Sequence, residues 1–268
     1  MPAIPIVSAR EPLLVLENVS KDFKLPGGAV LHAVRSVSLT VHAGEIVALV
    51  GESGSGKSTL GRIALGLLAA DSGGVVFDGQ NLTGMSPARF RDLRTGMQPI
   101  FQDPTASLNP RRTVRQLLMQ ALWKQPQEGE ARCIRLLNDV GLRPAAQYLD
   151  RYPHELSGGQ RQRVSIARSL AMEPKLIIAD EPLSGADVSI RGQVLNLLLD
   201  IQRTRHVAYL MITHDISIAR AFADRVAVMM KGELVEVGAA ETVLRTPAHD
   251  YTRRLVAAVP ALGSPRAT

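Results

Sequence analysis

The chain has 268 residues, of which 46% are hydrophobic, and carries a formal net charge of +6. This length and composition support a large buried core, which excludes disorder of the whole chain. A single cysteine, Cys133, excludes a disulfide framework and a multi-cysteine metal site. The positive charge would suit nucleic acid, anionic lipid or an anionic small ligand. Aromatic residues make up only 4% of the chain, and no basic run is interleaved with the stacking rings of single-strand binders, so we expect no nucleic-acid partner.

The membrane signals of secreted and spanning proteins are absent from the sequence. The first residues lack a basic region followed by a long apolar run, and no apolar stretch reaches the ~18 residues of a membrane span. We expect a cytosolic protein, or one bound to a membrane from the cytosol.

The first hundred residues contain most of the predicted strands. Apolar patterning predicts strands over Leu13–Val19, Val34–Val41 and Glu45–Val50. Residues 74–79 end in an Asp-Gly pair that suits a hairpin, which indicates a small antiparallel sheet in this region. Ser86 followed by proline is typical of the cap and first turn of a helix, which we expect to run to about residue 94.

Helical periodicity replaces the strand signal between about residues 104 and 156, notably over Val114–Leu122 and Glu128–Val140. Strand character then returns in three segments, Lys175–Asp180, Val207–Thr213 and Arg225–Met230. Helices between these strands fit the crossovers that a parallel sheet requires. The predicted fold class is therefore α/β, a mostly parallel sheet interrupted by a helical insertion.

Residues 51–58 match the eight-position pattern of a phosphate-binding loop, placed as the mechanism requires between a strand and a helix. The glycines let backbone N–H groups surround the phosphates. Lys57 supplies positive charge to the β- and γ-phosphates, and the Ser58 hydroxyl can ligate Mg²⁺. The residues predicted to contact the nucleotide here are Gly51, Glu52, Ser53, Gly54, Ser55, Gly56, Lys57, Ser58 and Thr59.

Two adjacent carboxylates, Asp180 and Glu181, end an apolar strand. Because side chains alternate along a strand, the two point in different directions and are expected to have different roles. We expect Asp180 to support Mg²⁺ through its water shell and Glu181 to accept a proton from the attacking water.

Gln102 and His214 each follow an apolar segment that is predicted to be a strand. Open parallel sheets bind ligands at the carboxyl ends of their strands. Together with the phosphate loop, Asp180 and Glu181, these two side chains predict one active site at a single edge of the sheet.

A second glycine-rich loop, Leu156-Ser157-Gly158-Gly159-Gln160, opens a predicted helix about a hundred residues after the first. A helix N-terminus presents unpaired N–H groups and a partial positive charge, so this loop is a second candidate phosphate site. With this stretch the chain resembles the ATP-binding-cassette (ABC) ATPase family, whose distinguishing signature it matches. The resemblance extends from about Leu13 to Pro260.

The resemblance implies a P-loop NTPase (RecA-like) core with a mostly parallel sheet, a small N-terminal antiparallel β subdomain and an inserted α-helical subdomain. The implied boundaries are 12–103 and 157–237 for the core with its antiparallel subdomain, 104–156 for the insertion and 238–268 for a C-terminal helical tail. The resemblance also implies that Gln102 is the switch glutamine that senses Mg²⁺ and water, that Glu181 is the catalytic base and that His214 contacts the γ-phosphate. Phe23 has two interpretations, stacking on adenine or packing at the end of a strand.

In the resembled family, the signature of one subunit meets the ATP that is held by the phosphate loop of its partner. Ser157 and Gly159 would then act in trans, with Gly158 and Gln160 of the same signature also expected to bind nucleotide, and hydrolysis would need a dimer. Asp187 matches the aspartate of the loop that crosses this interface. The preceding residues read Leu-Ser-Gly-Ala where the family usually has Ser-Ala-Leu before the aspartate, so the loop is atypical.

A finer resemblance points to importers of the oligopeptide, dipeptide and nickel type. It is carried by Phe101-Gln102-Asp103-Pro104, Ser107–Arg111, Asp187–Ile190, Gln193–Leu198, Tyr251–Leu255 and Ala257–Pro260. It implies an ATP-hydrolysing subunit that energises uptake of peptides or a related solute, such as nickel or a metal chelate. The implied partners are a second cassette, preferably a paralogue, two permease subunits and, indirectly, an extracytoplasmic solute-binding protein, at the cytoplasmic face of the inner membrane.

Two departures from that type are present. Pro99 removes a backbone donor from a predicted strand. The chain also ends soon after Pro260 without the cysteine-rich tail of some members, so no iron–sulfur cluster is expected.

Two other functions remain open at the level of the sequence. A soluble cassette ATPase acting on DNA or ribosomes is favoured by the positive charge, although tandem cassettes, coiled-coil arms and zinc cysteines do not appear. A regulatory, weakly hydrolysing cassette of an asymmetric pair is suggested by the atypical loop before Asp187. The presence of Lys57, Glu181, His214 and Ser157 argues against this second alternative.

Overall fold

The computed structural model describes residues 11–103, 107–124, 126–183 and 188–258. Its larger sheet has six strands in the order β10-β9-β3-β8-β7-β6. The strands are β3 (Ile46–Val50), β6 (Met97–Ile100), β7 (Leu176–Asp180), β8 (Ala208–Thr213), β9 (Arg225–Met230) and β10 (Glu233–Ala239). All neighbours are parallel except β10, which pairs antiparallel with β9. The predicted α/β fold with a mostly parallel sheet is confirmed.

Strand β10 was missed because its side chains are exposed or half-buried, which leaves no clear apolar pattern. Pro99 lies in β6, at the edge of this sheet, where a missing backbone donor is tolerated. Its carbonyl accepts a hydrogen bond of 2.9 Å from the Ser169 hydroxyl, so the backbone of this residue is still held by a hydrogen bond.

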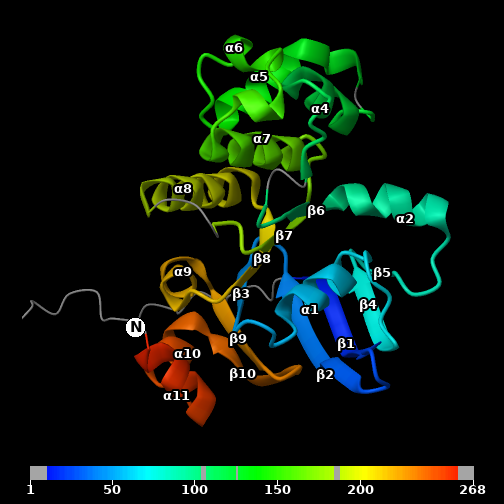
Figure 1. Cartoon of the computed structure of the whole chain (residues 1–268), viewed down its shortest axis with the longest axis vertical. Helices are drawn as coiled ribbons and strands as arrows, with labels where there is room; N and C mark the ends of the chain where they lie inside the picture. Colours follow the sequence, from blue (N-terminus) through cyan, green and yellow to red (C-terminus); the bar gives the residue numbers. More distant parts are fainter. Residues whose placement is uncertain (1–10, 104–106, 125, 184–187, 259–268) are drawn as a thin grey trace, which may run out of the picture.

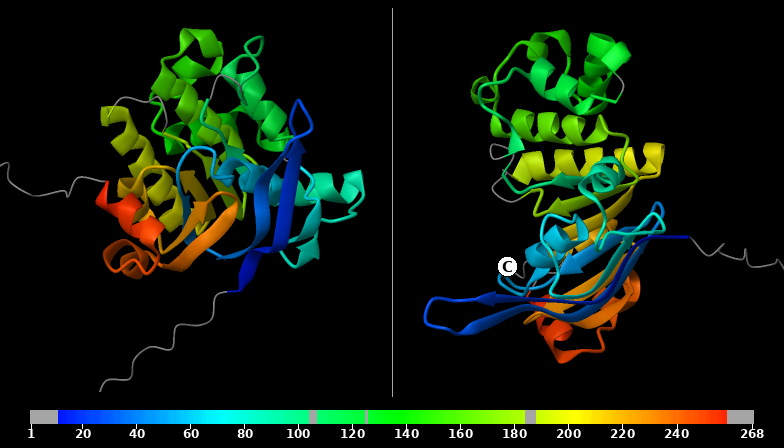
Figure 2. Two further views of the ribbon diagram at one scale, coloured as in Figure 1. Left: turned by 60° about the horizontal axis from the view of Figure 1, so that its bottom comes forward. Right: turned by 90° about the vertical axis from the view of Figure 1, so that its right-hand side faces the viewer.

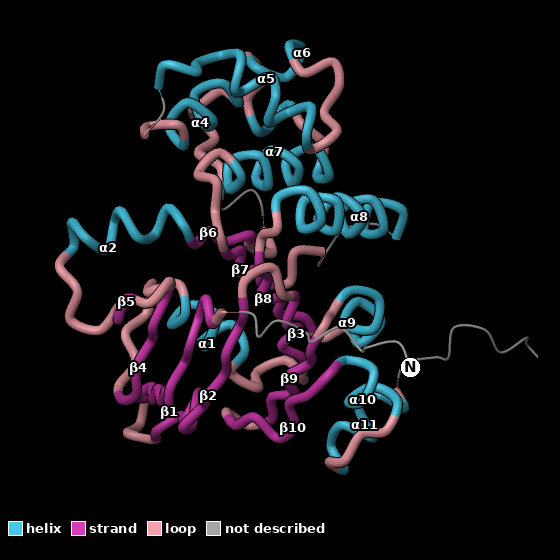
Figure 3. The backbone as a smooth tube through the Cα atoms, turned by 180° about the vertical axis from the view of Figure 1, so that it is seen from behind, coloured by secondary structure: helices cyan, strands magenta, loops and turns pink. Residues whose placement is uncertain are grey.

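A smaller antiparallel sheet lies beside the larger one and has the order β2-β1-β4-β5 (Figure 3). Its strands are β1 (Pro12–Lys24), β2 (Val30–His42), β4 (Ser72–Phe77) and β5 (Gln80–Asn81). The predicted hairpin is present: Phe77 pairs with Gln80, and the Asp78-Gly79 turn has positive φ at both residues, 50° and 72°.

Strands β1 and β2 are longer than predicted, because they continue as a hairpin that projects from the body of the molecule (Figure 2). Side chains near its tip, such as Leu25 and Leu31, are exposed, so burial imposes no alternation there. The backbone ladder nevertheless continues to the pair Lys24 and Val30.

Helices gather at the end of the molecule opposite the small sheet (Figure 1). They are α4 (Val114–Ala121), α5 (Gly129–Asp139), α6 (Ala146–Leu149), α7 (Gly158–Leu170) and α8 (Val188–Arg205). A buried cluster joins them to the larger sheet and includes Leu117, Leu136 and the free thiol of Cys133. Within the described ranges, none of the helices is both long and apolar enough to cross a bilayer.

Helix α2 (Pro87–Leu93) begins where predicted, but the Ser86 side chain makes no capping hydrogen bond. Proline at the first helical position favours the start, because its fixed φ suits a helix and its missing N–H is not needed there.

Strand β3 lies between two cores. Val47 and Leu49 pack with α1 (Lys57–Ala64) and the small sheet. Ala48 and Val50 pack on the other side with α9 (Ile216–Phe222), α10 (Ala240–Arg245) and α11 (Asp250–Ala257). Because both faces of β3 are covered, the loop that follows it leaves the sheet from a fixed point.

Candidate functional site

The phosphate loop connects β3 to α1, as the sequence predicted, and it is closely seated on its neighbours. Gly56 has φ 105°, and a Cβ added there would lie 2.1 Å from the Ala33 carbonyl oxygen of β2. A Cβ added at Gly51 would lie 2.1 Å from the Met229 carbonyl oxygen of β9. The Gly232 N–H, in the β9–β10 turn, donates to the Ser55 carbonyl over 3.0 Å. Glycine is therefore required at both ends of the loop.

The Lys57 side chain lies over the loop that precedes it and is 5% exposed. Its Nζ donates to the carbonyl oxygens of Gly51, at 2.8 Å, and Glu52, at 2.7 Å. Burial lowers the pKa of the Lys57 ammonium group, although the carboxylates Glu181, Asp180 and Glu52 oppose this effect. A poorly hydrated cation held over glycine-rich backbone is suited to bind a phosphate oxygen.

Ser58 and Asp180 meet across the site, from the start of α1 and the end of β7. The Ser58 hydroxyl donates to Asp180 Oδ1 over 2.9 Å. Burial raises the pKa of the Asp180 carboxyl and the nearby Glu181 carboxylate raises it further, while the bond from Ser58 lowers it. A hydroxyl and a carboxylate are hard oxygen donors of the kind that Mg²⁺ prefers, and a cation there would relieve the cost of the buried charge. The pair therefore fits Mg²⁺.

Glu181 points to His214 rather than to Ser58. Its Oε1 lies 3.0 Å from His214 Nδ1, and its N–H donates to the Ile212 carbonyl of β8 over 2.9 Å. The Glu181 backbone has φ 47°, a left-handed conformation that typically costs ~1–3 kcal/mol in a residue other than glycine. The strained backbone turns adjacent carboxylates to different partners, in agreement with their predicted divergence.

Gln102 lies just beyond β6, at the same edge of the sheet. Ile100, the last residue of β6, is the register partner of Ala179 in β7, which places Gln102 alongside Glu181 in the strand direction. Its side chain is exposed. The structure thus brings Lys57, Ser58, Asp180, Glu181 and His214 together and places Gln102 at their border.

The second glycine-rich loop caps α7. Ser157 Oγ accepts from the Gln160 N–H over 3.3 Å, and Gln160 Oε1 accepts from the Ser157 N–H over 2.9 Å. Ser157 and Gly158 are exposed, and Gly159 is half-buried. Helix α7 packs on β6, three strands away from β3, and belongs to the helical end of the molecule rather than to the core around α1 (Figures 1 and 2). Gln162 Nε2 donates to the Pro182 carbonyl over 3.0 Å, so α7 contacts the segment that follows Glu181.

A sequence model described as ABC transporter matches residues 34–184. The chain belongs to the ABC transporter family. It is 48% identical, over 260 residues, to the glutathione import ATP-binding protein GsiA of Escherichia coli O6:H1, covering 93% of this chain and 41% of that protein. Its identity to GsiA of Salmonella paratyphi A is 44% over 283 residues, covering 96% and 45%. The chain therefore spans less than half the length of these curated relatives.

Solved ABC structures share the fold. The dimeric post-hydrolysis structure of the ATP-binding cassette MJ0796, bound to ADP and Pi, superposes with a TM-score of 0.76 at 29% identity, covering 85% of this chain and 99% of that one. The cbiO1 protein of Clostridium perfringens, part of the ABC transporter complex cbiONQ, gives 0.74 at 29% identity, covering 88% and 96%. The resemblance to ABC importer ATPases that the sequence indicated is confirmed.

The roles assigned to the site residues stay predictions, and so do two further ligand contacts, Phe23 and Asp187, that the family resemblance suggested. Phe23 lies in the projecting hairpin opposite Leu31, with 36% of its surface exposed and Lys21 Nζ 5.8 Å from its ring centre. The residue is thus partly open to solvent. Asp187 and its atypical loop lie outside the described residues.

The sequence missed one neighbour of the phosphate loop in this cassette. The Tyr251 hydroxyl, on α11, accepts a hydrogen bond of 3.0 Å from the Glu52 N–H, between residues 199 positions apart. Tyr251 stood out in the sequence only as part of an importer-like segment. No spacing or periodicity relates it to the loop, so no signal in one sequence could have found this contact.

Proposed function

We propose that this chain binds Mg²⁺ and ATP and hydrolyses the ATP, as the nucleotide-binding subunit of an importer. The observation that supports this most is the convergence of Lys57, the Ser58–Asp180 pair and the Glu181–His214 pair at the edge where β3, β7 and β8 end. This set combines a phosphate seat, hard oxygen donors and a base with its partner. A structural role for the loop would not explain the two carboxylates beside it.

The backbone N–H groups of residues 51–59 would bind the phosphates. The Lys57 ammonium group would exchange its hydrogen bonds to the loop carbonyl oxygens for contacts with the β- and γ-phosphates. Ser58 and Asp180 would hold Mg²⁺, and Gln102 would lie at the border of this metal site. The ion would neutralise charge that develops on the phosphate oxygens.

Glu181 is the proposed general base for the attacking water. His214 Nδ1, 3.0 Å from Glu181 Oε1, fixes the orientation of that carboxylate, and the imidazole is the proposed γ-phosphate contact. The exposed fractions of the two side chains are 21% for Glu181 and 61% for His214, so both are reachable by water and nucleotide.

The signature loop is proposed to complete the site of a second cassette. Ser157 and Gly158 are exposed at the start of α7 rather than gathered around Lys57. Their cap hydrogen bonds are satisfied locally, which leaves a preformed helix N-terminus with positive partial charge for a partner's ATP. Two such chains, or this chain and a paralogue, would enclose two nucleotides.

Import is proposed from the similarity to glutathione import ATP-binding proteins. Glutathione is a small peptide, so peptides are the proposed cargo class, with nickel or a metal chelate as the related alternative. The cargo would pass through two separate permease subunits, fed by an extracytoplasmic solute-binding protein. This subunit would lie at the cytoplasmic face of the inner membrane without touching the cargo.

A groove beside Gln102 is the proposed permease contact. It has a volume of about 510 Å³ and lies between β6 and the helical end, where Phe101, Trp123 and Met172 provide apolar surface and Arg94 and Arg168 provide positive charge. This lining fits a short amphipathic helix with an acidic residue. Phe101 directly precedes Gln102. A movement of such a helix that shifts Phe101 would therefore also shift Gln102 at the nucleotide site.

Nucleotide binding and turnover test the proposal. Lys57→Ala should abolish ATP binding, and Glu181→Gln should retain binding while lowering turnover by about 10²–10⁴-fold. The matched control Glu11→Gln changes an exposed carboxylate far from the loop in sequence and should match the wild type. Undiminished turnover in Glu181→Gln would contradict the base assignment.

Purification from native membranes tests the importer role. The purified chain should retain two permeases and a second cassette, and their absence would contradict that role.

A further inference from the structure

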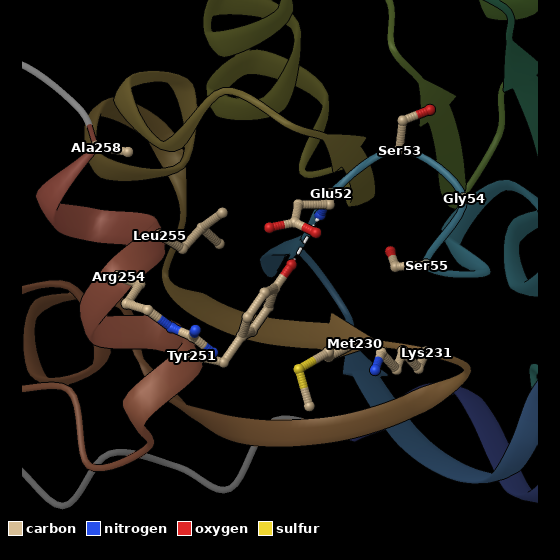
Figure 4. Close-up of a pocket in the computed structure, with 10 residues that line it drawn as sticks. All are labelled: Glu52, Ser53, Gly54, Ser55, Met230, Lys231, Tyr251, Arg254, Leu255 and Ala258. Atoms are coloured by element: carbon tan, nitrogen blue, oxygen red, sulfur yellow. Dashed lines mark hydrogen bonds between the residues drawn. The ribbon is translucent and has the colours of Figure 1, made fainter.

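The C-terminal helix α11 touches the phosphate loop through Tyr251 (Figure 4). Its hydroxyl points at the Glu52 N–H, beside a pocket of about 410 Å³. The pocket is lined by Glu52 and Ser53 of the loop, by Lys231 of the β9–β10 turn and by Arg254 of α11. The contact is made at Glu52, near the start of the loop, whereas Ser58 lies at the end of the loop.

Packing fixes the ring of Tyr251. The residue is 5% exposed and belongs to the cluster that contains Ala48 and Val50 of β3 and Val228 of β9. Val50 directly precedes Gly51, so the strand that carries the loop also packs with the ring. The hydroxyl is therefore held at a constant position relative to the loop.

The start of α11 is anchored as well. The Glu236 carboxylate of β10 accepts from the N–H groups of Ala248, at 2.8 Å, and His249, at 3.1 Å. His249 Nδ1 in turn accepts from the Tyr251 N–H over 3.1 Å. Burial alone would raise the pKa of Glu236, but its hydrogen bonds, those two included, outweigh burial and lower it. The carboxylate stays ionised and the anchor persists at neutral pH.

One planar peptide group connects Tyr251 to Lys57. The Glu52 N–H and the Gly51 carbonyl belong to the same peptide, and they point in opposite directions. The N–H bonds Tyr251, while the carbonyl accepts from Lys57 Nζ over 2.8 Å. The residue on the carbonyl side of this peptide is Gly51, with φ 152°. Because glycine has no Cβ, it offers little resistance to rotation of the peptide.

We propose that Tyr251 is a positioning residue for nucleotide: it fixes the Gly51–Glu52 peptide and so holds Lys57 and the loop ready for the phosphates of ATP. The inference rests on the proposed ATPase function. Without the hydroxyl, the peptide would rotate about Gly51 and the loop would lose part of its preorganisation, which ATP binding must then restore.

Tyr251→Phe tests the inference, because it removes the hydroxyl and keeps the ring. Loss of one hydrogen bond should raise the KM and Kd for ATP about three- to tenfold while kcat changes by less than about twofold. The matched control is Tyr209→Phe in β8. Tyr209 is also buried, and its hydroxyl has no hydrogen-bond partner among the residues that the structure describes, so its KM should equal that of the wild type. A purely structural role for Tyr251 would lower the melting temperature and leave the KM unchanged, which would overturn the inference.

Amide exchange of Glu52, measured by NMR without nucleotide, provides an independent measurement. Exchange should be about tenfold faster in Tyr251→Phe than in the wild type, and an unchanged rate would overturn the inference. If wild-type protein binds ATP and Lys57→Ala does not, while Tyr251→Phe behaves like Tyr209→Phe, the proposed function stands and the inference fails. If wild-type protein does not bind ATP, the proposed function fails and the inference with it.

Discussion

Glu45 holds a buried negative charge just before β3, the strand that leads into the phosphate loop. Its carboxylate accepts from the His42 N–H at 2.8 Å, lies 2.9 Å from His42 Nδ1 and accepts from Arg225 Nη1 at 3.1 Å. Burial alone would raise the pKa of Glu45, but the bonds from His42 and Arg225 outweigh it and lower the pKa. The charge therefore stabilises the junction of β2, β3 and β9.

The sign of the pH dependence follows from that lowered pKa. A carboxyl with a lower pKa in the folded state contributes its full stability above its unfolded pKa of ~4.3, and loses it as the pH falls through the folded value. Glu45→Gln should lower the free energy of unfolding by about 1–3 kcal/mol at pH 7, and the difference from wild type should narrow below about pH 4. Urea unfolding at both pH values measures this. The exposed Glu17→Gln should show neither effect, and an equal difference at both pH values would contradict the prediction.

The phosphate loop is an element whose shape depends on strands that are distant in sequence. The pattern of residues 51–58 predicted the strand, the loop and the helix, because glycine spacing and a following Lys-Ser pair are local properties. It could not show that the loop rests on Ala33 and Met229 or that Tyr251 binds it. Those contacts depend on how the sheets and α11 pack. The same limit applies to the exposed hairpin of β1 and β2, whose length is set by backbone pairing rather than by burial.

Gly56 and Gly54 allow two requirements of the phosphate loop to be tested separately, namely a positive φ and space for the backbone beside β2. Both have positive φ, 105° and 79°, but a Cβ at Gly56 would clash with the Ala33 carbonyl, whereas a Cβ at Gly54 would meet open space. Gly56→Ala should therefore weaken ATP binding more than tenfold and lower stability by more than the ~1–2 kcal/mol of backbone strain expected for Gly54→Ala. Calorimetric titration with ATP and thermal unfolding of both variants measure this. Equal losses in the two variants would show that contact with β2 does not constrain the loop.

At the scale of the whole molecule, the two glycine-rich loops occupy different layers. The phosphate loop leaves the centre of the larger sheet, and the signature loop starts α7, which packs on the edge strand β6. The hydrogen bond from Gln162 of α7 to the Pro182 carbonyl, just after Glu181, links these layers. A partner's nucleotide bound at Ser157 would therefore be connected to the proposed base of this chain through α7.

Gly158 provides the sharpest test of action in trans. A Cβ added there meets nothing within 4 Å and its φ is ordinary, so Gly158→Arg should leave folding and ATP affinity of the single subunit unchanged. It should nevertheless abolish hydrolysis in the assembled protein, because the arginine would occupy the space of the partner's nucleotide. The smaller change Gly158→Ala should lower the rate of hydrolysis less. Where two copies of this chain form the dimer, equal mixing with Lys57→Ala subunits should restore part of the turnover, since each mixed dimer contains one site with both elements intact. If Gly158→Arg instead weakens ATP binding by the isolated subunit, the signature acts on its own nucleotide and the proposed dimer mechanism is wrong.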